Sequence, residues 1–331
     1  MKAEKPVAEL DKEPSAPHPR ETFSFVGHEA EEAALAEALR GGRMHHAWLL
    51  AGPKGLGKAT LAYRVARAAL GAKRIGPRPL DVDPEDPIAR RVMALSHPDL
   101  FVLRRGLNDR GKPRREIAVD DARELGHFFS LAPSEGGMRV AIVDAVDDLN
   151  RNAANAILKT LEEPPARSIL LLVCHAPGAI LPTIRSRCRR LALRTLSDEQ
   201  VKKASGADAG IVALAKGRPG RAIALKAQGV DTAGADPKRA YSEIARGASA
   251  ALLGGLYDKM SGEPFEKLAG VLELAGEWTR AAGVEQGGEQ WAEAWSALEM
   301  LRSEAEGLDM DPRHALARAA GVLDRAGASR Q

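Results

Sequence analysis

The feature that most constrains this fold is a short apolar run, residues 48–51, that enters a glycine-rich turn and leaves it as a helical pattern. In the turn, Gly52, Gly57 and Lys58 fit the spacing G-x-x-x-x-G-K of a phosphate-binding loop. Glycines let backbone N–H groups curl inward, the start of a helix adds partial positive charge, and a lysine reaches the outer phosphates. We therefore expect ATP or ADP at this loop, bound by Gly52, Pro53, Gly55, Gly57, Lys58 and Thr60.

One position in the loop departs from the pattern of a site that hydrolyses nucleotide. The hydroxyl that should follow the lysine and hold Mg²⁺ is replaced by Ala59, and Thr60 stands one residue late. The loop therefore predicts a nucleotide fold, whereas the alanine predicts that its chemistry is impaired.

A second element of a nucleotide site shows a similar loss. The apolar run 140–143 ends in Asp144, whose carboxylate we expect at the edge of the sheet, among the nucleotide-binding residues. The glutamate that should follow it and polarise the attacking water is replaced by Ala145. Asp147 and Asp148 come later and are expected to point elsewhere. Nucleotide is thus expected to bind without being hydrolysed.

Three further apolar runs follow the first, and all four are continuous rather than alternating. Continuous apolar strands are typical of a parallel sheet that is covered on both faces. Helical patterns lie between the runs, and this alternation predicts an α/β sandwich. The expected strands are 48–51, 100–103, 140–143 and 169–173, and the expected helices between them are 59–70, 120–131 and 153–163.

Composition and strand signals divide the chain into segments. The first 20 residues are charged, rich in proline and poor in groups that a core could bury, which predicts disorder. After Leu193 the strand signal stops, and Ser197 followed by Gln200 fits a helix capping box. We expect a disordered tail at 1–20, an α/β domain at 21–194, a small helical domain at 195–236 and an all-helical domain at 237–331.

Three later segments carry a family resemblance. The triplet Ser186-Arg187-Cys188 follows Pro182-Thr183-Ile184, residues 155–165 end in E-E-P-P, and residues 97–100 read H-P-D-L. Together they resemble the bacterial clamp-loader subunits of the AAA+ superfamily over residues 25 to about 225. The resemblance implies an AAA+ parallel-sheet nucleotide-binding domain, a helical lid domain and a C-terminal all-helical collar domain.

The resemblance also implies a role for the triplet. In the family this arginine reaches a nucleotide held by a neighbouring subunit, so Arg187 is the expected arginine finger, with Ser186 and Cys188 completing the SRC motif. A guanidinium suits that task because it is always charged and forked for phosphate oxygens. Taken alone, Arg187 would be interpreted in the first place as an ordinary surface arginine in a basic cluster.

The pattern of losses resembles one class within the family. The active loader ATPase of the family carries a hydroxyl and a glutamate where this chain has Ala59 and Ala145, and it usually has a four-cysteine zinc module, whereas this chain has no cysteine between Gly71 and His97. The clamp-opening delta subunit generally lacks the SRC arginine, which this chain keeps as Arg187. An arginine finger beside an impaired site resembles the delta-prime class of DNA polymerase III, although a zinc module common in that class is missing. The implied function is a structural stator of the loader ring. The implied partners are the loader ATPase subunits and the delta subunit, with the sliding clamp and primer-template DNA reached through the complex.

Smaller features leave alternatives open. Arg221 stands where the family places a sensor 2 arginine that binds nucleotide, but a surface arginine at a helix start fits as well. The basic loop 104–115 is consistent with DNA contact or with a solvated hairpin. Cys174 and His175 end the fourth strand, at the family's sensor 1 position, and are not expected to bind metal.

Composition narrows the remaining function classes. The net charge of +3 disfavours a stand-alone DNA-binding protein. Two cysteines provide no disulfide framework or four-cysteine zinc site, so no metal is expected. Without an apolar run of about 20 residues or a signal region, we expect a cytoplasmic protein with no membrane contact. The competing hypothesis is a self-sufficient AAA+ ATPase that acts on DNA through Lys58 and Asp144.

Overall fold

The computed structural model describes residues 16–107, 114–230, 235–308 and 310–328. Contacts divide the chain into two compact units, one formed by Met1–Gly206 with Lys216–Arg221 and the other by Ala207–Ala215 with Ala222–Gln331. This division passes through the expected lid at 195–236, so the three-domain boundaries stay a prediction.

The first unit contains a five-stranded sheet in which every neighbouring pair is parallel, in the order β2-β3-β4-β1-β5. Four strands match the expected apolar runs, and β5 is an additional edge strand with mostly exposed side chains. The strands are β1 (Ala47–Ala51), β2 (Leu100–Arg104), β3 (Arg139–Asp144), β4 (Ser168–Cys174) and β5 (Arg189–Ala192).

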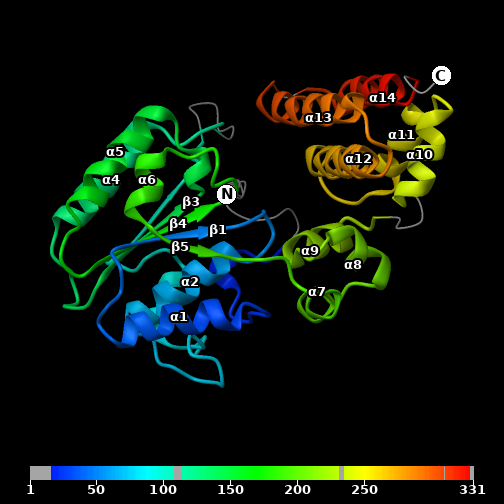
Figure 1. Cartoon of the computed structure of the whole chain (residues 1–331). Helices are drawn as coiled ribbons and strands as arrows, with labels where there is room; N and C mark the ends of the chain where they lie inside the picture. Colours follow the sequence, from blue (N-terminus) through cyan, green and yellow to red (C-terminus); the bar gives the residue numbers. More distant parts are fainter. Residues whose placement is uncertain (1–15, 108–113, 231–234, 309, 329–331) are drawn as a thin grey trace, which may run out of the picture. The chain divides into compact units, whose positions relative to one another are not determined.

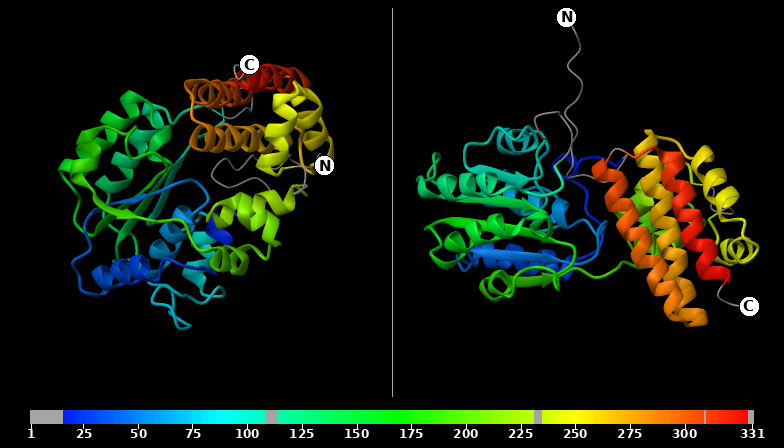
Figure 2. Two further views of the ribbon diagram at one scale, coloured as in Figure 1. Left: turned by 45° about the vertical axis from the view of Figure 1, so that its right-hand side comes forward. Right: turned by 90° about the horizontal axis from the view of Figure 1, so that it is seen from above.

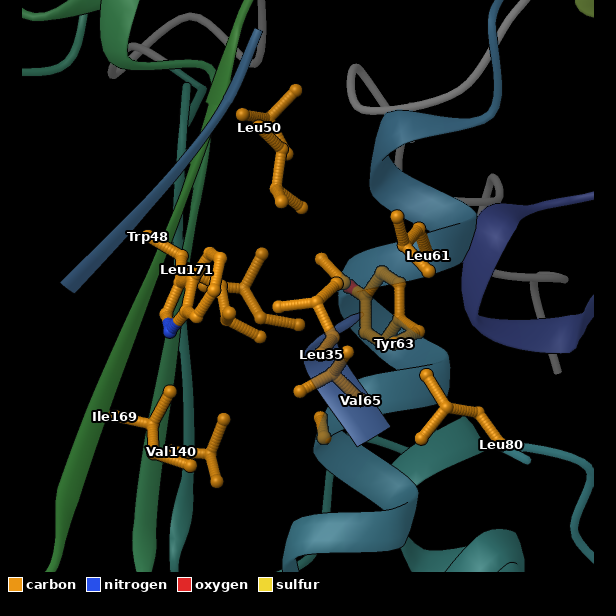
Figure 3. Packing of buried hydrophobic residues seen from close by; sticks show 14 of the residues in the cluster. Leu35, Trp48, Leu50, Leu61, Tyr63, Val65, Leu80, Val140, Ile169 and Leu171 are labelled. Carbon is orange, nitrogen blue, oxygen red and sulfur yellow. The ribbon is translucent and has the colours of Figure 1, made fainter. Parts of the chain in front are cut away.

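Helices cover both faces of this sheet (Figure 1). On one face, Trp48 and Leu50 of β1 pack against Leu61 and Val65 of the helix that follows (Figure 3). Leu49, between them, faces a second cluster formed with the helices of the opposite face. Because both faces of each inner strand are buried, the strands are apolar without alternation, as the sequence predicts.

The helices of the first unit lie before, between and after the strands. Two short 3₁₀ segments, η1 (Pro19–Glu21) and η2 (Val146–Asp148), accompany them. Ser197 and Gln200 form the expected capping box at the start of α7. The helices are α1 (Glu29–Arg40), α2 (Lys58–Ala69), α3 (Pro87–Met93), α4 (Val119–Ser130), α5 (Arg151–Glu162), α6 (Pro182–Arg187) and α7 (Asp198–Ser205).

Residues 16–20 correct the expectation of a disordered tail at 1–20, of which 1–15 lie outside the described residues. His18 is 1% exposed, and the guanidinium of Arg67 donates to the carbonyls of Arg20 and Thr22. A buried guanidinium needs acceptors, and the backbone carbonyls of Arg20 and Thr22 supply them. Composition alone therefore does not predict the ordered backbone of residues 16–20.

The second unit is helical in all its described elements. In Figure 2 the long helices α12, α13 and α14 lie side by side in both views. Their core includes Leu272, Trp278 and Trp291, and the half-buried Trp295 lies under the Arg280 guanidinium. The helices are α8 (Ala209–Ala215), α9 (Pro219–Ala227), which begins in the first unit, α10 (Pro237–Ala245), α11 (Ser249–Lys259), α12 (Pro264–Gln286), α13 (Glu289–Leu308) and α14 (Pro312–Ala328).

In the part of the chain that the structure describes, no helix is both long enough and apolar enough to span a bilayer.

Candidate functional site

The glycine-rich loop leaves the carboxyl end of β1 and enters α2. The amide of Gly52 donates to the carbonyl of Cys174, the last residue of β4, at 3.1 Å. The amide of Leu193, just after β5, donates to the carbonyl of Ala51 at 2.8 Å. The loop therefore lies at the edge where the parallel strands end, which is the usual place for ligands in such sheets.

Two glycines of the loop leave no room for a side chain. Gly57 caps α2 with φ +84°, and a Cβ there would meet the Phe25 ring at 2.9 Å. A Cβ on Gly52, whose φ is +149°, would meet the carbonyl oxygen of Leu193 at 2.6 Å. Packing within the protein thus requires glycine at both positions, in addition to any requirement of a ligand.

Lys58 is buried at the first residue of α2, with 3% of the residue exposed. Its ammonium donates to the carbonyls of Gly52 at 2.6 Å and Pro53 at 2.7 Å. The side chain therefore folds over its own loop. Pro53 is exposed, and Thr60 is half-buried in the first turn of α2.

Asp144 is the last residue of β3, where it is half-buried and pairs in register with Val173 of β4. Ala145 follows and is 3% exposed, so the position of the missing glutamate is a buried methyl group. Because alanine stands at positions 59 and 145, the site lacks one metal ligand and one carboxylate.

Asp147 makes contacts at the end of β4 that the sequence did not predict, because its side chain was expected to point away from the site. Its carboxylate accepts hydrogen bonds from the amides of His175 and Ala176, each at 2.7 Å. The thiol of Cys174 lies 3.7 Å from the same carboxylate. Asp147 therefore fixes the backbone at the end of β4, directly beside the residue that binds Gly52.

His175 follows β4 and lies in a cationic environment. Burial lowers the pKa of its imidazole to about 3, with Lys58 as the next cause and Lys54 and Arg105 acting in the same direction, while Asp147 opposes them. The ring is thus neutral. Burial, together with Asp147, raises the pKa of the Cys174 thiol to about 12, so this cysteine is neither a nucleophile nor an anionic ligand.

The described ends of the basic loop 104–115 are tied to acidic side chains. Arg105 lies 3.2 Å from Asp148, and Arg114 lies 3.2 Å from Asp121. Burial raises the pKa of the Asp148 carboxyl, and the charge of Arg105 opposes that rise. Residues 108–113, the middle of the expected DNA-binding or solvated loop, lie outside the described residues.

The SRC triplet closes the short helix α6. Arg187 is its last residue, with a side chain 35% exposed, and its guanidinium lies 2.7 Å from Glu162 at the end of α5. Ser186 is exposed and donates to the Thr183 carbonyl at 3.1 Å. Cys188 is half-buried, and burial raises the pKa of its thiol to about 12.

Arg221 is 4% exposed in the first turn of α9, within the first unit. Its backbone N would lie 3.1 Å from a Cβ on Gly55, and the amide of the preceding Gly220 donates to the Gly55 carbonyl at 2.9 Å. The structure thus places Arg221 beside the phosphate-binding loop, and its burial disfavours the reading as a surface arginine.

The H-P-D-L segment lies at the other end of the strands. Asp99 is 1% exposed, accepts from the amides of Ser134 and Glu135, and pairs with Arg139 at 3.3 Å. It therefore organises the loop before β3 and has a structural task. Burial lowers the pKa of the adjacent His97.

The loop residues fit the phosphates of a nucleotide better than they fit a metal ion. Gly57 caps a twelve-residue helix, and Lys58 is the first residue of that helix. Ala59 offers no oxygen to Mg²⁺. Among the residues that the structure describes, no group of three or more His, Cys, Asp or Glu side chains is placed to hold a metal ion.

Comparison with known families identifies the group to which these features belong. The family described as DNA polymerase III, delta subunit, matches residues 27–197, more than half of the chain. The chain belongs to this family. The match runs from just before α1 through the SRC triplet and up to Ser197, so it includes the loop, Asp144 and Arg187.

Curated relatives agree with this DNA polymerase III assignment. The chain is 35% identical over 213 residues to the DNA polymerase III subunit delta' of Pseudomonas aeruginosa, covering 60% of this chain and 61% of that one. It is 37% identical over 147 residues to the delta' subunit of Yersinia pestis, covering 44% and 41%. The tau subunit of Escherichia coli is 33% identical over 183 residues, covering 55% and 27%. The chain thus spans less than two thirds of the length of each of these relatives.

Solved structures match more weakly. A DNA polymerase III gamma subunit-related protein of Thermotoga maritima aligns with a TM-score of 0.49 and 15% identity, covering 90% of this chain and 99% of that one. The Thermotoga maritima RuvB Holliday junction branch migration motor aligns with a TM-score of 0.41 and 16% identity, covering 92% and 90%.

For this member of the DNA polymerase III family, the resemblance to the delta-prime class is confirmed. The expected α/β fold class is confirmed as well, with a five-stranded parallel sheet between helices and an all-helical region after it. The roles of the site residues stay predictions.

Proposed function

We propose that this chain is a clamp-loader subunit that donates Arg187 to ATP bound by a neighbouring subunit. The observation that carries the proposal is the placement of Arg187, whose part-exposed guanidinium ends a short helix at the surface of the first unit. A planar, permanently charged group at such a position suits the charge that develops on a γ-phosphate. Arginine fingers of this kind accelerate well-studied NTPases by roughly 10³–10⁵-fold.

The chain's own loop has a different task in this proposal. Without oxygen ligands at Ala59 and Ala145, it holds ATP or ADP through Lys58, Arg221 and the glycine backbone and does not hydrolyse it. The chain then acts as a stator, a fixed part of the ring. This argument disfavours the alternative of a self-sufficient ATPase acting on DNA.

The partners follow from the family. We propose that the chain assembles with the loader ATPase subunits and the delta subunit in the cytoplasm, and reaches the sliding clamp and primer-template DNA through that complex. The DNA polymerase III relatives support this assembly. The helical second unit is the proposed collar through which the subunits join.

The test is the ATPase rate of the reconstituted complex, stimulated by DNA and clamp. Arg187→Ala is expected to lower that rate by at least about tenfold while assembly is unchanged. Arg187→Lys restores little, because an ammonium lacks the planar fork. The matched control is Arg190→Ala, since Arg190 is exposed and three residues away. An equal loss with Arg190→Ala would show general electrostatics and overturn the specific role.

A further inference from the structure

The E-E-P-P segment has no role in the function proposed so far, yet it touches the SRC triplet. Oε1 of Glu162 lies 2.7 Å from Nη2 of Arg187. Nη1 of the same guanidinium donates to the Thr183 carbonyl at 3.1 Å and to Oγ of Ser186 at 3.5 Å. Acceptors on two different helices thus hold the two terminal nitrogens.

The sequence fixes where Glu162 stands. Pro164 disfavours the helical conformation for the residue before it, and Glu163 indeed leaves the helix with φ −121° and ψ +71°. Helix α5 therefore ends at Glu162, one residue after the buried Leu161. The Glu162 carboxylate thus lies at a helix end that the buried Leu161 fixes to the core.

The second helix is anchored in the same core. Ile184 of α6 is 1% exposed and belongs to the same cluster as Leu161 and Ile157 of α5. Since both helices are fixed by one apolar cluster, the separation between Glu162 and Arg187 is set by packing. The side chains themselves are 50% and 35% exposed, so their ion pair adds little to stability.

We propose that Glu162 is the positioning residue of Arg187, holding one edge of the guanidinium so that the group is presented in a single orientation. This role rests on the proposed function of Arg187. An arginine side chain has many rotamers, and a partner that selects one reduces the ordering needed when a phosphate binds. A guanidinium has five N–H donors, so one carboxylate oxygen leaves donors for a phosphate.

The experiment measures the DNA- and clamp-stimulated ATPase of the full reconstituted complex. Glu162→Ala in this chain is expected to lower kcat by about three- to tenfold, with the KM for ATP, assembly and the melting temperature of the chain unchanged. Glu162→Gln keeps an oxygen acceptor and is expected to lie between the alanine variant and the natural protein. The matched control is Glu163→Ala, since Glu163 is an exposed carboxylate next in sequence, and full activity is expected.

A double variant separates positioning from a merely structural effect. If Glu162 acts through Arg187, then Arg187→Ala with Glu162→Ala is no slower than Arg187→Ala alone. Additive losses, an unchanged kcat in Glu162→Ala, or an equal loss in Glu163→Ala would each overturn the proposal. Full activity in Arg187→Ala would overturn the finger itself and this role with it, whereas low activity there with full activity in Glu162→Ala overturns only the role of Glu162.

Discussion

Nη2 of Arg64 lies 2.5 Å from Oε1 of Glu32, and neither side chain is more than 2% exposed. The pair joins α2 to α1, and Arg64 also lies 2.7 Å from Asp81 in the segment after α2. Arg78, from the same segment, binds the other oxygen of Glu32 and the carbonyl of Phe25. One buried carboxylate thus holds two cations and ties the segment after α2 to α1.

Loss of this carboxylate is expected to be costly. Glu32→Ala removes the buried carboxylate that Arg64 and Arg78 share and leaves Asp81 beside Arg64, so we expect a loss of about 3 kcal/mol in the free energy of unfolding, measured by denaturant titration. Glu37→Ala is the control on the same helix, at an exposed position, with an expected change below about 0.5 kcal/mol. Similar losses in both variants would contradict the importance of the buried pair.

The isolated chain is expected to lack ATPase activity. Restoring Ala145→Glu alone is expected to leave it inactive, because the metal ligand at position 59 is still missing. The measurement is the steady-state release of phosphate by the purified chain. A rate typical of an ATPase that disappears in Lys58→Ala would mean that the chain hydrolyses ATP at its own loop.

Nucleotide binding is expected to depend weakly on magnesium. Ala59 cannot ligate the ion, so the affinity for ADP measured by calorimetry should change by less than about threefold between Mg²⁺ and EDTA. Lys58→Ala is expected to abolish binding in both conditions. Strong dependence on Mg²⁺ would indicate that Thr60 takes the place of the missing ligand.

The half-buried His175 makes a pH-dependent contribution to stability. Its pKa is lowered from the ordinary 6.5 to about 3 in the folded protein, chiefly by burial, so the unfolded chain binds the proton more readily. The contribution is therefore complete above pH 6.5 and is lost as the pH falls from 6.5 toward 3, at a slope of up to roughly 1.4 kcal/mol per pH unit.

Replacement of this side chain tests that slope. His175→Gln is expected to flatten the fall in the free energy of unfolding between pH 6 and 4, relative to the natural protein. His127→Gln, at an exposed position on α4, is the control and should leave the slope nearly as it was. Identical slopes in all three proteins would show that His175 is not buried in a neutral form.

The parts of the fold that the sequence predicted are those with a local signal. The three inner strands, β1, β3 and β4, are buried on both faces and so appear as continuous apolar runs. The edge strand β2 is mostly half-buried, but its apolar run also marked it in the sequence. The edge strand β5 begins with two exposed arginines and holds only Leu191 and Ala192 as apolar residues, so no continuous apolar run marked it. A propensity argument has no means of finding a strand whose formation depends on its neighbour β1.

The residues of the candidate site also divide into those that a local sequence signal marks and those that only the folded chain brings together. Gly52 and Lys58 were singled out by their spacing, Asp144 by the apolar run before it and Arg187 by the family resemblance of its triplet, and their roles stay predictions. The bond from Asp147 to the His175 amide joins residues 28 positions apart and exists only in the folded chain. The partner of Arg187 was equally hidden, since the E-E-P-P segment was recognised as a motif without a reason for its glutamates.

The contact between Gly57 and the Phe25 ring has a consequence for how such chains diverge. Glycine is required at position 57 by an aromatic neighbour, and at position 52 by the Leu193 carbonyl, whatever the loop binds. A descendant that had lost all affinity for nucleotide would still be under selection to keep both glycines. The signature of a phosphate-binding loop can thus outlive its ligand in evolution, and its survival in a sequence records the packing of the loop as much as its use.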